Sequence, residues 1–124
     1  MQSNVDVSST IKTLAQQCVS QNSIDPELYA KYAVKRGLRD INGRGVLAGL
    51  TDVSKIKSYI MEDDEMIPCE GKLYYQGMDV QTLVAGFIEE DRLGFEETTY
   101  LLLFGALPNE EQLTEFKAIL AEYR

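Results

Sequence analysis

Four consecutive acidic residues are the densest group of side chains in this sequence that could do chemistry. They form the run Glu62-Asp63-Asp64-Glu65. Carboxylates act as general acids and bases, and they bind hard metal ions. This run lacks the alternating ligand spacing and the glycine of a calcium loop. We therefore expect a solvated connection between two elements, with a metal site as the less favoured alternative.

Histidine is absent from all 124 residues. Its absence removes Ser-His and Cys-His nucleophile pairs, imidazole acid-base catalysis near neutral pH and most zinc sites. Of the two cysteines, Cys18 falls on the apolar face of a predicted helix, where a free thiol behaves as a small hydrophobe. We assign no catalytic, cofactor-binding or metal-binding residue, and no cofactor, to this chain.

The glycine-rich segment Asn42-Gly43-Arg44-Gly45-Val46-Leu47-Ala48 superficially fits the G-x-G-x-x-A dinucleotide fingerprint. That fingerprint needs a buried strand before it and a helix opening from it. The preceding residues 35–40 are too polar for a buried strand. A turn around Asn42 and Gly43, where a positive φ is tolerated, explains the glycines more simply.

The net charge of -8 argues against nucleic-acid binding, because phosphate contact needs clustered lysine and arginine. Positive charge gathers in one stretch, as Lys31, Lys35, Arg36, Arg39, Arg44, Lys55 and Lys57. A solvated surface is favoured there over a face for an anionic ligand or an acidic neighbour. Tyr74 and Tyr75 beside Lys72 are better explained as one buried and one surface-facing strand residue than as a platform for bases.

Compartment signals are few. No apolar run approaches the roughly 20 residues that cross a bilayer, and the start, residues 1–4, lacks the basic and apolar regions of a signal peptide. Two far-separated cysteines, Cys18 and Cys69, without a secretion signal favour a reducing cytoplasm.

Two helices are predicted near the amino terminus. The first starts with Ser8 or Ser9 as its cap, ends at Asn22-Ser23, and carries apolar residues at helical spacing, which are Ile11, Leu14, Cys18 and Val19. The second has Asp25 as its cap and Pro26 at its first position, and it closes at Gly37 after Lys35 and Arg36 in its last turn.

A small antiparallel sheet is predicted in the glycine-punctuated stretch that follows. One strand spans Ile56 to Ile60, a second spans Leu73 to Tyr75, and the acidic run lies between them as a hairpin connection. Such a sheet is marginal by itself and needs something to pack on.

The last third predicts three amphipathic helices. Asp79 caps the first, whose apolar stripe is Val80, Leu83, Val84, Phe87 and Ile88. The second runs from Gly94 to Gly105 and is apolar almost all round near its end. Asn109 caps the third, with Gln112 placed to complete a capping box, and its stripe is Leu113, Phe116, Ile119, Leu120 and Tyr123.

These elements indicate a mainly α architecture with a small antiparallel β-sheet. We divide it into an amino-terminal helical segment 1–37, a sheet region 38–78 and a truncated three-helix segment 79–124, read together as one structural domain. The last stripe reaches Arg124 without a stop signal, which suggests a cut chain. We expect the faces at 101–104 and 113–120 to lack cover and to cause self-association.

Three ordered blocks resemble the amino-terminal region of citrate synthases. They are RGLRDINGRGVLAGLTDV at 36–53, EGKLYYQGMDVQTL at 70–83 and GFEETTYLLLFGALPN at 94–109. Their order and separations make coincidence a poor explanation. One position departs from the family pattern: Gln76 stands where arginine is common, which removes a fixed cation and bidentate donor.

The resemblance implies a mainly α-helical homodimer that condenses acetyl-CoA with oxaloacetate to citrate and CoA, at the entry to the tricarboxylic acid cycle. In that family two histidines and an aspartate carry the chemistry. None can be carried over to a chain without histidine, so we expect the amino-terminal fragment of a bacterial citrate synthase, inactive alone, in the cytoplasm, with neither nucleic acid nor membrane as partner.

Two alternatives stay open. A 2-methylcitrate synthase resembles citrate synthase and differs in the shape of its acyl pocket. A standalone acidic interaction module would explain the missing histidines without truncation, but it would leave the three ordered blocks unexplained.

Overall fold

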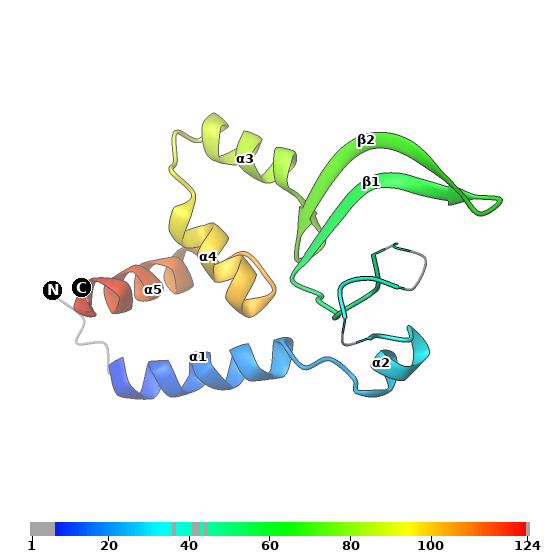
Figure 1. Ribbon diagram of the computed structural model, residues 1–124. Helices are drawn as coiled ribbons and strands as arrows, with labels where there is room; N and C mark the ends of the chain where they lie inside the picture. The colour runs from blue at the N-terminus through cyan, green and yellow to red at the C-terminus, as the bar shows by residue number, and fades with distance from the viewer. Residues whose placement is uncertain (1–6, 36, 41–42, 44, 124) are drawn as a thin grey trace, which may run out of the picture.

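The computed structural model describes residues 7–35, 37–40, 43 and 45–123 (Figure 1). Its elements in chain order are α1 (Val7–Gln21), α2 (Glu27–Lys31), β1 (Ser54–Glu62), β2 (Glu65–Tyr75), β3 (Met78–Asp79), α3 (Val80–Glu89), α4 (Phe95–Phe104) and α5 (Glu110–Glu122). The predicted fold class is confirmed: the structure is mainly helical, and one antiparallel sheet has the order β1-β2-β3.

The three carboxy-terminal helices begin and end where local signals predict. Asp79 Oδ1 accepts a hydrogen bond from the backbone N–H of Gln81 at 2.8 Å, which caps α3. Asn109 and Gln112 form a complete capping box at the start of α5, with both bonds at 2.9 Å. Gly105 ends α4 in the left-handed region, at φ 79°, where glycine has no Cβ to clash.

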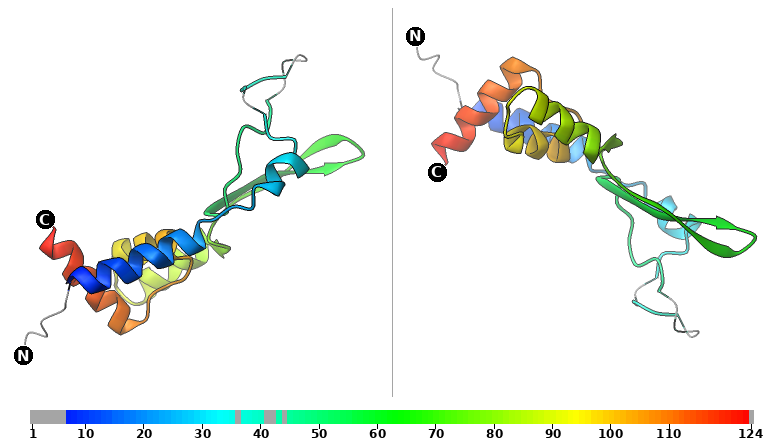
Figure 2. Two further views of the ribbon diagram at one scale, coloured as in Figure 1. Left: turned by 90° about the horizontal axis from the view of Figure 1, so that it is seen from below. Right: turned by 90° about the horizontal axis from the view of Figure 1, so that it is seen from above.

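The core consists of two adjoining clusters. The first joins Leu83 and Phe87 of α3 to Leu101 of α4, with Tyr75 and Met78 of the sheet packed against them. The second is aromatic and links α4 to α5 and α1; its buried members are Tyr100, Phe104 and Phe116, flanked by Leu14, Cys18 and Leu120. The ring of Phe116 meets those of Tyr100 and Phe104 edge-on, at centroid distances of 5.4 and 6.0 Å, a favourable aromatic geometry. Figure 2 shows α1 alongside this helical group.

The predicted hairpin is present and longer than expected. Its strands pair from Ser54 with Tyr75 at the base to Glu62 with Glu65 at the tip. Asp63 and Asp64 form the turn with positive φ values of 47° and 64°, a conformation that aspartate tolerates. The hairpin projects away from α3, α4 and α5 as an arm (Figures 1 and 2). We call strands β1 and β2 with this turn the arm.

Several amino-terminal predictions were wrong. Helix α1 already includes Val7, so Ser8 and Ser9 lie inside it and do not cap it. Val19 is 75% exposed, because the helix turns this side chain away from the aromatic cluster that Leu14 and Cys18 contact.

Helix α2 is also shorter than predicted. Asp25 does accept a hydrogen bond from the N–H of Glu27 at 2.9 Å, as a cap would. The helix nevertheless ends at Lys31, because Ala33 takes a positive φ of 50° and breaks the ladder. The backbone N–H of Lys35 then donates to the carbonyl of Leu47 at 2.8 Å, so Gly37 is not its C-cap.

Some sequence-based expectations fall on positions outside the described residues. These are the start at 1–4, Arg36 in the expected last turn of the second helix, Asn42 and Arg44 in the glycine-rich segment, and the end at Arg124.

Candidate functional site

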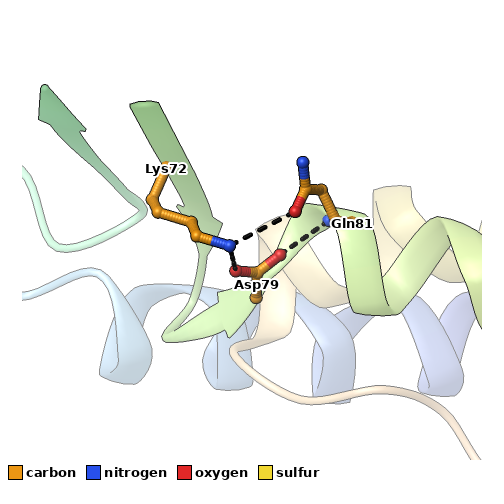
Figure 3. A network of polar contacts seen from close by, with 3 residues as sticks. All are labelled: Lys72, Asp79 and Gln81. Carbon is orange, nitrogen blue, oxygen red and sulfur yellow. Dashed lines mark hydrogen bonds and ion pairs between the residues drawn. The ribbon is translucent and has the colours of Figure 1, made fainter. Parts of the chain in front are cut away.

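A polar network lies where the sheet meets α3 (Figure 3). Lys72 Nζ lies 3.6 Å from Asp79 Oδ2 and donates to Gln81 Oε1 at 3.3 Å. The sheet register produces this arrangement, because Tyr74 pairs with Asp79 across the β2–β3 turn. Lys72 is two residues before Tyr74 on the same face of β2, so it is the diagonal neighbour of Asp79.

The electrostatics of the network make Asp79 a stable anion. The hydrogen bond from the backbone N–H of Gln81 has the largest effect on the pKa of the Asp79 carboxyl and lowers it. Desolvation opposes this effect in part, and the Lys72 ammonium lowers the pKa further, so that the net shift is downward. One carboxylate oxygen is committed to the helix cap and the other to the lysine. A carboxylate held in this way positions α3 on the sheet and is a poor general base, since its affinity for a proton is reduced.

Two surface hollows flank the sheet. One of about 330 Å³ lies beside the network and is lined by Ile56, Gly71, Lys72, Leu73, Asp79, Val80 and Gln81. The other, of about 490 Å³, is lined by Thr51, Asp52, Ser54, Lys55, Tyr74 and Gly77. The second offers hydroxyl groups with one cation and one anion, which suits hydrogen bonding to a polar group but supplies no activated nucleophile.

The two strand tyrosines are both half-buried, so the expectation of one buried and one surface-facing ring was only partly right. Tyr75 packs against the Leu83 cluster, whereas Tyr74 lines the larger hollow. They lie on opposite faces because successive side chains of a strand alternate.

Gln76 occupies the tight turn between β2 and β3. It has a positive φ of 47°, and Gly77 follows at 81°. Its N–H donates to the carbonyl of Val53 at 2.8 Å, and its side-chain amide donates weakly to the carbonyl of Leu102 at 3.5 Å. The side-chain amide of Gln76 therefore contacts the backbone of α4, and its backbone N–H contacts the segment before β1.

An ion pair between an exposed arginine, Arg92, and a buried glutamate, Glu97, was not predicted from the sequence. Glu97 is 7% exposed in the first turn of α4, and its Oε1 pairs with Arg92 Nη1. Arg92 also lies over the ring of Phe87, 5.2 Å from its centroid, and its Nε pairs with Glu90 at 2.9 Å. The sequence offers no signal for this pair, because it depends on the path of the loop between α3 and α4.

The acidic run forms the tip of the arm, with Glu62 and Glu65 ending its strands. Among the residues that the structure describes, no three His, Cys, Asp or Glu side chains gather closely enough to hold a metal ion. In the basic stretch the described residues are solvent-exposed, as a solvated surface requires. Within the described ranges, both cysteines are free thiols.

The helix faces that we expected to lack cover are largely buried inside this chain. Leu101, Phe104, Phe116 and Ile119 are 1–6% exposed, because α1, α4 and α5 pack on one another. Leu103, within the first of these faces, is nevertheless exposed. Other exposed apolar side chains lie around the loop between α3 and α4 and along the arm, and they include Ile88, Leu93, Phe95, Ile56, Met61 and Met66.

No helix in the described part of the chain combines the length and the apolar character needed to cross a membrane.

The geometry of these sites does not identify a protein family, but comparison with known proteins does. The family model for the citrate synthase C-terminal domain matches residues 37–124. The chain is 34% identical over 91 residues to 2-methylcitrate synthase 1 of Corynebacterium glutamicum, which covers 73% of this chain and 18% of that protein. It is 38% identical over 55 residues to a citrate synthase-related protein of Dictyostelium discoideum, which covers 44% of this chain and 12% of that protein.

The chain thus spans less than a fifth of the length of these two relatives. No solved structure matches it significantly. The family match covers more than half of the chain, including the sheet and α3 to α5. On this evidence, the chain belongs to the citrate synthase family.

Proposed function

We propose that this chain is the amino-terminal part of an enzyme that condenses acetyl-CoA with oxaloacetate, and that the chain alone is inactive. The observation that carries the proposal is the family match over 37–124 in a sequence without histidine. The family's chemistry uses two histidines and an aspartate, so the imidazoles must come from outside these 124 residues. The chain covers only 12% and 18% of the length of the two relatives. This small share agrees with catalytic residues that lie outside the chain.

The chain's role in such an enzyme is structural. Neither hollow beside the sheet contains an imidazole, and the charged network of Lys72 and Asp79 is occupied in capping α3. The buried clusters around Leu101 and Phe116 give the helices a defined arrangement on which further helices can pack. We expect the parent enzyme to be a cytoplasmic homodimer.

A second candidate activity has its own support. The relative from Corynebacterium glutamicum that matches 73% of this chain is a 2-methylcitrate synthase. An enzyme of that kind would use propionyl-CoA in place of acetyl-CoA. The acyl pocket that separates the two substrates is formed by residues outside this chain.

The experiment is to read the source gene past the codon for Arg124 and to express the full reading frame. A frame that continues through further helices with two well-spaced histidines and a later aspartate supports the proposal. Release of free CoA is then followed with oxaloacetate and either acetyl-CoA or propionyl-CoA. A higher kcat/KM for acetyl-CoA assigns citrate synthase, and the reverse assigns 2-methylcitrate synthase. A stop codon directly after Arg124 would contradict both and favour an interaction module.

A further inference from the structure

The larger of the two hollows lies at the base of the arm and carries charges of both signs. Its volume is about 490 Å³, and its lining includes Asp52 and Lys55. These two side chains are exposed, and they form no ion pair with each other or with any other residue that the structure describes. A carboxylate and an ammonium that border one hollow without pairing can each bind an opposite charge on a ligand.

The sheet register places a second lysine next to this hollow. Lys55 pairs with Tyr74 and Lys57 pairs with Lys72, so these four side chains project from one face of the arm. Lys72 Nζ lies 3.6 Å from Asp79, whereas Lys57 has no ionic partner within the described ranges. Like charges directly opposite each other in a sheet are destabilising. An anion bound beside Lys57 would therefore relieve its repulsion with Lys72.

Hydroxyl groups complete the lining of the hollow, and they come from Thr51, Ser54 and Tyr74. Thr51 Oγ1 accepts a hydrogen bond from the backbone N–H of Val53 at 3.3 Å, which leaves its hydroxyl hydrogen able to donate to a ligand. The half-buried ring of Tyr74 adds an apolar surface for a short carbon chain. The hollow thus combines donors for a carboxylate with a contact for a small carbon skeleton.

We propose that this hollow binds an acidic α-amino acid, such as L-glutamate. The site contributes two ammonium groups and one carboxylate, and the ligand contributes two carboxylates and one ammonium. The α-ammonium of the ligand pairs with Asp52 and its α-carboxylate with Lys55, while its side-chain carboxylate pairs with Lys57. The two lysines are two residues apart along β1, roughly 7 Å, a distance that the extended side chain of glutamate can bridge. This inference does not rest on the proposed function.

The test is a titration of the full 124-residue chain with three ligands, followed by amide NMR shifts. L-glutamate carries all three charged groups, glutarate lacks the ammonium, and L-glutamine lacks the charge on the side chain. Glutamate should bind about fivefold more tightly than either of the others, because each of them loses one ion pair at a partly exposed site.

Two variants assign the charged groups of the ligand to their partners. Asp52→Asn should weaken glutamate binding about fivefold without weakening that of glutarate, which has no ammonium for Asp52 to bind. Lys57→Gln should weaken glutamate binding by a similar factor without weakening that of glutamine. A folding defect would weaken the binding of all three ligands together, so it cannot produce this crossed pattern.

Matched controls make the same charge changes away from the hollow, with Asp64→Asn at the tip of the arm and Lys12→Gln on α1. Asparagine tolerates the positive φ at position 64. Both controls should bind glutamate within about twofold of the wild type, because distant exposed charges are screened. Three results would overturn the proposal: no saturable binding of glutamate, equal affinity for glutamate and glutarate, or controls that weaken glutamate binding as much as the variants in the hollow do.

Discussion

Gly94 lies directly against the ring of Phe87, so closely that a Cβ atom added to Gly94 would overlap three carbons of that ring. The contact fixes the turn between α3 and α4. Gly94 is the N-cap residue of α4 and takes a positive φ of 70° there. Phe87 is itself part of the core cluster with Leu83 and Leu101. The packing of two helices therefore depends on the absence of a side chain at one position.

Gly94→Ala should destabilise the fold by about 2–4 kcal/mol, because the new methyl group overpacks the core and a non-glycine residue is strained at positive φ. The measurement is the free energy of unfolding from urea titration. Gly86→Ala is the matched control: Gly86 is inside α3 and its added Cβ would meet nothing within 4 Å. That variant should be more stable than the wild type by about 0.5–1 kcal/mol. Equal effects of the two changes would contradict the assigned contact.

Arg92 has two carboxylate partners, Glu97 and Glu90, and they should differ in their contribution to the free energy of unfolding. Glu97→Ala is expected to cost about 1.5–3 kcal/mol, because it removes a charge-assisted bond to a carboxylate that is itself buried, while Arg92 stays accessible to solvent. Glu90→Ala removes the partner whose side chain is 65% exposed, and it should cost about 1 kcal/mol or less. Thermal unfolding of the two variants side by side gives the comparison. A larger loss for Glu90→Ala would contradict the assignment of Glu97 as the stronger partner of Arg92.

Asp79 should contribute to the acid sensitivity of the fold. Its folded-state pKa is lowered, chiefly by the Gln81 N–H, from the ordinary value of 3.8. A lowered pKa means that the stabilisation is present above the unfolded-state value and is lost as the pH falls through the folded-state pKa. Asp79→Asn keeps a capping side chain and removes the titration. The difference in urea midpoint between wild type and variant should therefore be largest near neutral pH and shrink below about pH 4. A difference independent of pH would contradict the assignment.

The capping box of α5 gives a prediction that is local to one helix. Asn109→Ala removes the acceptor for the N–H of Gln112 and should cost about 1 kcal/mol. Asn109→Ser supplies a hydroxyl acceptor at the same place and should recover most of the loss. Urea unfolding of both variants measures this. An alanine variant as stable as the wild type would mean that the box does not hold the start of α5.

The parts of the fold that could be predicted are those set by neighbouring residues. Asp79, Gly105 and Asn109 mark helix ends through hydrogen bonds or φ values within a few positions of themselves. The hairpin was also predicted from neighbouring residues, because the acidic run lies between two strand-like segments. Asp63 and Asp64 of that run form the turn, and aspartate tolerates the positive φ values that the turn requires.

The parts that failed depend on distant packing. The early end of α2 follows from Ala33, whose positive φ accompanies the bond from Lys35 to Leu47 and has no local signature. The exposure of Val19 depends on which side of α1 meets the aromatic cluster. Lys72 reaches Asp79 only through the register of the β2–β3 turn.

The expectation that catalytic residues lie outside the chain rests on the family match and on the absence of histidine, and it stays a prediction. It is tested most directly by oxaloacetate-dependent release of CoA from acetyl-CoA, measured for the 124-residue chain and for the product of the full reading frame at equal concentration. We predict release by the longer product and none above background by the chain alone. Turnover by the chain alone would contradict the central claim, since no family histidine could then be responsible.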